Sequence, residues 1–459
     1  MTRALLAGAA ALTLGACAVG PDYVAPTPVP AAGAPFASGQ SPAFTGDEPP
    51  GRWWSLFGDP LLESLVEQAL ANNTDLRAAA ANLSRARAVL RESRTGLLPS
   101  TNLTGSVTHG QEPGGPTGEV FDAGLDVGYQ LDLFGRVRRG IEASRADAEA
   151  VQAAFDLTRV TVAAETTRAY ADACSAGRQL AVANETLRIQ ERTFDLTRRL
   201  FEGGRATALD TNQAGALLDQ TRAAIPTLEA ARDTALFRLA VLTGRPPAEF
   251  PREVAACVAA PTLAEPSPVG DGAGLLARRP DIRAAERELA AATARIGVAT
   301  ADLYPSISIG GSVGTTATSS GNLFSSDSFR FGIGPLISWS FPNIAVARAR
   351  IAQAEASNDA ALAQFDGAWL NALRETESAL TRYARELDRR AALTRARDQS
   401  GEAARIARLR YQAGREGFQV LLEAERTLAQ ADAALAQSEA QLSDQLITLF
   451  LALGGGWQE

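Results

Sequence analysis

The sequence predicts an α+β membrane protein, in which a few β-strands are joined to very long helices. Three observations predict this class. The chain starts with a short apolar export segment, four later segments alternate between apolar and small or polar residues, and residues 136–202 contain no proline. Alternation with a period of two residues is typical of membrane strands, and a proline-free stretch of that length is typical of a coiled-coil helix.

Residues 1–16 have the features of a lipoprotein signal peptide. An apolar run from Ala4 to Leu14 is followed by the sequence Leu14-Gly15-Ala16-Cys17. The run is too short to span a bilayer, so we expect cleavage before Cys17 and a covalent lipid on that residue. Ala18 stands where an acidic residue would favour retention of a lipoprotein in the inner membrane. We therefore expect the protein to be sorted to the cell outer membrane. The alternative is a buried cysteine within an ordinary signal peptide.

Composition argues against several classes of function. The formal net charge is −8, which gives nucleic acid no electrostatic attraction. The chain has one histidine and three cysteines, and it contains no catalytic-triad pattern or phosphate-binding loop. We therefore expect that it is not an enzyme, that it has no metal site, and that it needs no cofactor apart from the lipid on Cys17.

The same order of elements is written twice along the chain. Residues 75–79 recur as residues 281–285, and Pro99-Ser100 recurs as Pro305-Ser306, in both cases 206 residues later (281 − 75 and 305 − 99). We predict a Pro-rich, unpacked strap at 17–52, a first repeat at 53–244, a linker at 245–270 and a second repeat at 271–459.

Each repeat is expected to contain one β-hairpin and one pair of long helices. The hairpins are predicted at 99–133 and 305–341, and the helix pairs reverse at glycine-containing turns, 200–207 and 410–417. Apolar residues recur every seven positions, which favours a left-handed coiled coil. They are Leu180, Leu187, Phe194 and Phe201 in the first repeat, and Leu421, Leu428, Leu435, Leu442 and Leu449 in the second.

The strand count predicts an oligomer. Four strands per chain cannot close a barrel, and open sheet edges are not tolerated in lipid. Two copies would supply eight strands, whose interior is largely filled by side chains, whereas three copies would supply twelve and could leave a pore. We therefore expect a homotrimer with a twelve-stranded β-barrel, continued by a long α-helical coiled-coil tunnel.

The order and spacing of several short motifs resemble the TolC/OprM-type outer-membrane factors, specifically their lipoprotein (NodT-like) branch. The motifs are Gly20-Pro21-Asp22-Tyr23, Trp53-Trp54, Phe57-Gly58-Asp59-Pro60, Leu131-Asp132-Leu133-Phe134-Gly135, Arg278-Arg279-Pro280-Asp281-Ile282, residues 299–307, and the turn with Tyr411 and Gly414. The resemblance implies an exit channel for efflux with a periplasmic tunnel. It also implies two partners, a periplasmic adaptor and an inner-membrane transporter, most often of the RND type.

The resemblance further implies a gate at the periplasmic tips. Tyr411 and Gly414 match the family's second turn, and Glu416 falls where relatives often place a charged residue facing the pore. Three copies of Glu416 would bring carboxylates together and favour cations. Alternatively, Glu416 caps the first turn of the next helix. Glu423 and Asp210 are weaker candidates. Val420 stands where some relatives have an acidic residue, which argues against an inter-helix salt-bridge lock.

Four residues outside the gate carry separate expectations. An oxidising compartment favours a disulfide between Cys174 and Cys257 that pins the linker to a long helix, and two separate buried thiols are the alternative. We expect Trp53 and Trp54 to pack in the core.

Two other functions remain open from the sequence. One is the outer-membrane duct of a type I protein secretion system, and the other is a lipid-anchored coiled-coil scaffold. The sequence argues against a periplasmic adaptor, because an adaptor would carry one helical hairpin rather than two repeats with strand pairs.

Overall fold

The computed structural model describes residues 18–111, 117–339, 341–342 and 344–455. The chain packs as two compact units, each assembled from three separate stretches. Unit 1 takes the described part of Met1–Thr27 together with Ala81–Ala153 and Asp281–Ala368. Unit 2 takes Pro28–Ala80, Ala154–Pro280 and the described part of Trp369–Glu459. Cys17 lies outside the described residues.

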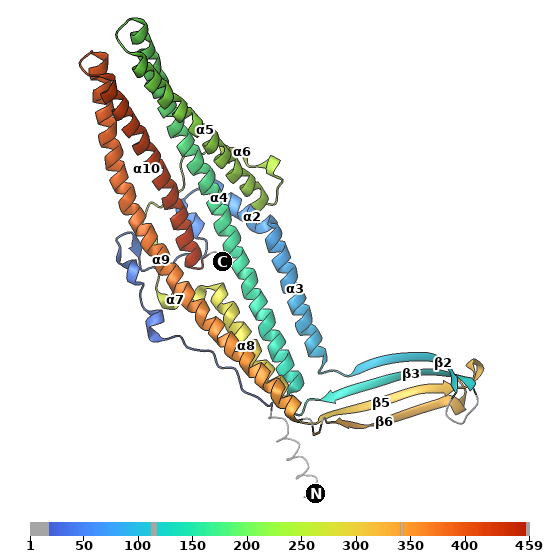
Figure 1. The fold of residues 1–459 in the computed structure, drawn as a ribbon. Coiled ribbons are helices and arrows are strands. Elements are labelled where there is room, and N and C mark those ends of the chain that lie inside the picture. The colour runs from blue at the N-terminus through green and yellow to red at the C-terminus, as the bar shows by residue number, and fades with distance from the viewer. Residues whose placement is uncertain (1–17, 112–116, 340, 343, 456–459) are drawn as a thin grey trace. The chain divides into compact units, whose positions relative to one another are not determined.

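Unit 1 contains one four-stranded antiparallel sheet (Figure 1). Its strands are β2 (Ser100–Gln111), β3 (Thr117–Leu131), β5 (Ser306–Ala317) and β6 (Phe329–Ser338). The order is β2-β3-β5-β6, so the two hairpins join through β3 and β5. The period-two segments form these strands, although β6 stops at Ser338, before the end of the predicted hairpin at residue 341. Two short 3-10 turns, Ser320–Asn322 and Ser326–Ser328, lie in the second hairpin's loop.

The sheet has two chemically different faces. Exposed apolar side chains gather on one face, because they occupy alternate positions of each strand. They include Leu103, Val107, Leu125, Val127, Ile309, Val313, Phe329, Phe331, Ile333 and Ile337. The opposite face carries mostly small and polar residues, with Val120 and Leu336 as exposed apolar exceptions.

The helices are much longer than the strands. In the second half of each repeat, a helix of 67 or 69 residues is followed by a helix of 35 residues. The first pair is α4 (Arg136–Glu202) and α5 (Ala208–Leu242), and the second is α9 (Ile344–Gln412) and α10 (Phe418–Ala452). The other helices are α2 (Pro60–Asn72), α3 (Thr74–Thr95), α7 (Gly272–Arg278) and α8 (Pro280–Ala301). Among the described residues, none of these helices has both the length and the apolarity needed to cross a membrane.

The main hydrophobic core lies in unit 2. Trp53, in the 3-10 turn Trp53–Phe57, is completely buried and stacks on Phe450 of α10 with ring centroids 4.9 Å apart. Trp54 is also buried. The heptad leucines of α10 are buried or half-buried along the whole helix, which agrees with their seven-residue spacing. At about 25 cal/mol per Å² of apolar surface, such aromatic and leucine burial supplies the main stabilising term.

The strap and the linker are more structured than expected. Phe36 and Phe44 of the strap are buried in the main core, so this segment is not an unpacked tether. Strand β1 (Phe44–Thr45) pairs in parallel with β4 (Ser267–Pro268) of the linker. The strap also forms 3-10 turns at Pro30–Gly33 and Ala37–Gln40, and the linker forms Pro247–Glu249 and α6 (Arg252–Ala255). These pairings depend on residues more than 200 positions apart, which local sequence patterns do not reveal.

Candidate functional site

The turn between α9 and α10 depends on a glycine in the left-handed backbone conformation. Gly414 has φ of +67°, a conformation that costs an L-residue about 1–2 kcal/mol. Its N–H donates to the carbonyl of Tyr411 at 2.9 Å, and the N–H of Arg415 donates to the carbonyl of Arg410 at 2.9 Å. These bonds satisfy the last carbonyls of α9 and let the chain reverse into α10.

Glu416 lies in this turn, one residue before Gly417, the N-cap of α10. Its carboxylate pairs with Arg410 at 3.4 Å. The first turn of α10 contains no acidic residue, and Gly417 provides no side-chain cap. Glu416 therefore does not act as the helix cap that the alternative interpretation required, and its charge stays at the turn.

Tyr411 lies between three helices of unit 2. Its ring centroid is 5.8 Å from that of Phe418 on α10. Burial raises the pKa of the Tyr411 hydroxyl, a hydrogen bond with Thr197 of α4 opposes the shift, and the nearby Asp210 carboxylate adds to it. The side chain therefore remains a neutral phenol at ordinary pH and links the α9–α10 turn to α4.

The connection between α4 and α5 has a side-chain cap at the start of α5, whereas the connection between α9 and α10 has none. Thr207 and Asp210 form a capping box at the start of α5, with the Thr207 N–H 2.9 Å from the Asp210 carboxylate. A side-chain cap contributes about 1 kcal/mol. Val420, 210 residues after Asp210, is exposed and provides no such group. Glu423 pairs with Arg426 at 3.2 Å on its own helix, and the Asp210 carboxylate is engaged in the capping box.

A buried carboxylate lies behind the turn and was not singled out from the sequence. Glu425 of α10 is 2 % exposed, and one of its oxygens accepts hydrogen bonds from Arg408 of α9 and Thr193 of α4. A signal was present, because Glu425 is four residues after Leu421 and thus on the buried face of the helix. A carboxylate on that face needs a partner, and here the partner is Arg408.

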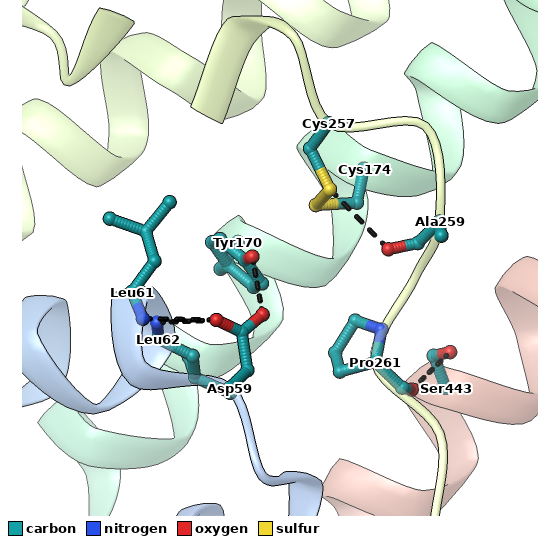
Figure 2. The surroundings of a disulfide bond; sticks show 9 residues. All are labelled: Asp59, Leu61, Leu62, Tyr170, Cys174, Cys257, Ala259, Pro261 and Ser443. Atoms are coloured by element: carbon teal, nitrogen blue, oxygen red, sulfur yellow. Dashed lines mark hydrogen bonds between the residues drawn. A yellow bond between two sulfur atoms is a disulfide. The ribbon is translucent and has the colours of Figure 1, made fainter. Parts of the chain in front are cut away.

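The linker is fastened to two long helices (Figure 2). The structure places a disulfide between Cys174 of α4 and Cys257 of the linker, with their Cα atoms 4.8 Å apart. Four residues further on, the carbonyl of Pro261 accepts a hydrogen bond from Ser443 of α10 at 3.2 Å. The linker therefore connects α4 to α10 within unit 2.

The residues that follow Cys17 are held in unit 1. The N–H of Val19 donates to the carbonyl of Phe134 at 3.2 Å, and the buried Arg139 pairs with Asp22 at 2.7 Å. His109 is in β2 and exposed. Over the described ranges of the chain, no group of three or more His, Cys, Asp or Glu side chains could hold a metal ion.

Comparison with known proteins gives one consistent result. The family model described as "Outer membrane efflux protein" matches residues 65–245 and 274–455. Nodulation protein T of Rhizobium leguminosarum bv. trifolii is 31% identical, with 97% of this chain and 96% of the relative covered. The antibiotic efflux pump outer membrane protein ArpC of Pseudomonas putida is 32% identical, with coverage of 100% and 97%. A solved structure of the outer-membrane channel OprN has a TM-score of 0.91 at 38% identity, covering 96% of this chain and 100% of that chain.

Proposed function

The chain belongs to the outer membrane efflux protein family, and from this premise we propose that three copies form the outer-membrane exit duct of a tripartite efflux system. Its role is transport across the outer membrane, without catalysis. Cargo would be delivered by an inner-membrane transporter, in our proposal of the RND type, through a periplasmic adaptor. The selection of cargo then lies mainly with these partners.

The single observation that supports a trimer is the open, four-stranded sheet. Strands β2 and β6 are the edges of the four-stranded sheet, and one face presents exposed apolar side chains. In lipid, such edges must be paired, and repetition of the sheet around a symmetry axis pairs β6 of one copy with β2 of the next. Three copies give a twelve-stranded barrel wide enough for a water-filled lumen.

We propose that the α9–α10 turn is the periplasmic gate. Glu416 carries a charge at the turn, Tyr411 ties the turn to α4, and Gly414 sets its geometry. The turn has no side-chain cap, whereas the α4–α5 turn has a capping box. The second turn is therefore the less stabilised of the two, which suits the part that must open.

We also propose that Cys17 carries a covalent lipid. The segment directly after it is fixed to unit 1 through Arg139 and Phe134, close to the end of β3. A lipid at this point would anchor the unit that contains the sheet to the membrane. We propose no cofactor other than this lipid.

The experiment that tests the proposal measures the mass of the full-length protein extracted from outer membranes in detergent. A trimer is expected, with a mass slightly below three times the 48.1 kDa of the whole chain, because residues 1–16 are removed, plus the lipid. Replacement of Cys17 by serine should remove the added lipid mass and leave the trimer assembled. A monomer or dimer as the largest stable species would contradict the proposal.

A further inference from the structure

One ion pair in the sheet of unit 1 joins β6 to β3 across the strand between them, β5. Arg330 on β6 reaches over β5 and places its Nη2 atom 3.0 and 2.9 Å from the two carboxylate oxygens of Asp122 on β3. Thr316 on β5 accepts a hydrogen bond from the Arg330 Nε at 3.0 Å and donates one to Asp122 at 2.7 Å. The three side chains, here called the cross-strand cluster, therefore satisfy one another.

Two glycines clear the path of Arg330. Gly314 is directly opposite Arg330 on the neighbouring strand, and Gly124 is directly opposite Gly314. A Cβ atom on Gly124 would lie 3.3 Å from the Arg330 Nη2 atom. Since neighbouring strands are about 4.8 Å apart, the guanidinium can extend to β3 only because this row has no side chains in between.

The register assigns the cluster to the polar face of the sheet. Asp122 pairs with Ser106 on β2 and with Thr316 on β5, so all three residues point to one side. The apolar residues Leu125, Val313 and Phe331 occupy the alternate positions and point to the other side. Both charged members remain accessible, because 46 % of the Arg330 side chain and 28 % of the Asp122 side chain are exposed.

We propose that the cross-strand cluster lines the lumen of the duct and keeps the charge of its own ring near zero, so that this ring favours neither anionic nor cationic cargo. The inference rests on the proposed trimeric duct, in which the apolar face meets lipid and the polar face meets water. Threefold symmetry places three carboxylates and three guanidinium groups around one ring. Their charges cancel only while both partners are present.

The test is the chloride-to-potassium permeability ratio of purified trimers in planar bilayers, obtained from reversal potentials across a potassium chloride gradient. A low salt concentration is needed, because the screening length is about 10 Å at 0.1 M. Asp122→Asn leaves three uncompensated positive charges and should raise the ratio about twofold or more. Arg330→Gln leaves three negative charges and should lower it by a similar factor.

Three further variants separate charge from structure. The double variant Asp122→Asn/Arg330→Gln should return to the wild-type ratio, and Arg330→Lys, which keeps the charge without the fork of donors, should also keep it. Glu119→Gln removes one negative charge from the same strand, β3, but from a position on the opposite face, and should leave the ratio unchanged.

Three results would overturn the inference. Either both single variants conduct with the wild-type ratio, or Glu119→Gln shifts the ratio as much as Asp122→Asn. A shift in Arg330→Lys as large as that in Arg330→Gln would also contradict it, since charge would then not be the cause. Wild-type conductance is recorded first, and its absence would count against the proposed duct rather than against the role of the cluster.

Discussion

Arg408 on α9 donates two hydrogen bonds to a single carboxylate oxygen of Glu425 on α10, from Nε at 3.1 Å and from Nη2 at 2.9 Å. Thr193 on α4 donates to the same oxygen at 3.0 Å. One buried atom therefore connects three helices directly behind the α9–α10 turn. Burial of a charge in this way is costly unless the charge is paired, so Glu425 depends on Arg408.

The first prediction concerns the loss of this partner. Arg408→Met should lower the free energy of unfolding by about 3 kcal/mol, because it leaves a buried carboxylate without its counter-charge. The double variant Arg408→Met/Glu425→Gln should recover most of the loss, since the neutral amide can still accept from Thr193. Thermal unfolding of the trimer in detergent measures both changes. Equal midpoints for the single and double variants would show that the pairing is unimportant.

The second prediction concerns pH. Burial raises the pKa of Glu425 above its ordinary value of 4.5, and hydrogen bonds from Arg408 and Thr193 oppose this only in part. The folded state therefore binds the proton more tightly than the unfolded state does. Its contribution to stability is largest below the ordinary pKa and is lost as pH rises through the raised folded-state pKa.

The matched variant for this pH dependence is Glu425→Gln. Its unfolding midpoint, measured from about pH 4 to about pH 8, should fall less with rising pH than that of the wild type. A wild-type curve parallel to that of the variant would contradict the assignment of the pH dependence to Glu425.

The third prediction concerns Gly177 on α4. A Cβ atom at this position would lie 2.1 Å from the carbonyl oxygen of Cys257, a backbone atom that cannot rotate away. Gly177→Ala should therefore destabilise the fold, although alanine is the better helix former by about 1 kcal/mol. For Gly140→Ala on the same helix, no described atom outside the adjoining helix backbone lies within 4 Å of the new Cβ, so this substitution should not destabilise the fold. Equal effects of the two substitutions would disprove the close packing of the linker on α4.

The fourth prediction concerns the disulfide. Cys174 and Cys257 are separated by 83 residues, and a cross-link closing a loop of that size stabilises a fold by about 4.5 kcal/mol in the chain-entropy model. Replacing both cysteines by serine should lower the unfolding midpoint, and a reducing agent should lower the wild-type midpoint but not that of the variant. Titration of two reactive thiols in denatured, unreduced protein would contradict the bond.

The fifth prediction concerns the gate. Glu416→Gln removes three carboxylates from the proposed ring and should lower the preference of the open channel for potassium over chloride by about twofold or more. Glu423→Gln, on the exposed side of α10, is the matched control and should change the preference less. If both variants keep the wild-type selectivity, Glu416 does not face the conducting path.

The family, the helical pairs and the strand segments could be predicted because their signals are local and repeated. The period-two segments and the heptads of Leu421 and Leu442 depend only on nearby positions in the chain, and the offset of 206 residues shows that the same pattern occurs twice. The family comparison confirms the membership that the short motifs indicated.

Long-range partners could not be predicted. The pairing of Phe44 with Ser267 and the reach of Arg330 to Asp122 depend on which segments the fold brings together. The sequence places Glu425 on the same helix face as Leu421, but its partners Thr193 and Arg408 are known only once α4 and α9 are packed against it. The interpretation of Glu416 as a helix cap was also wrong. Helix α10 begins at Phe418, and the Glu416 carboxylate pairs with Arg410 at the end of α9 instead.

The most direct test of the central claim is the single-channel conductance of the purified, full-length protein in planar bilayers. If three copies form a passive exit duct, discrete ion-conducting events should appear, and their number should rise with the amount of trimer added. Trimers that insert into the bilayer but never conduct, under any voltage, salt concentration or pH, would contradict a duct and favour a lipid-anchored scaffold.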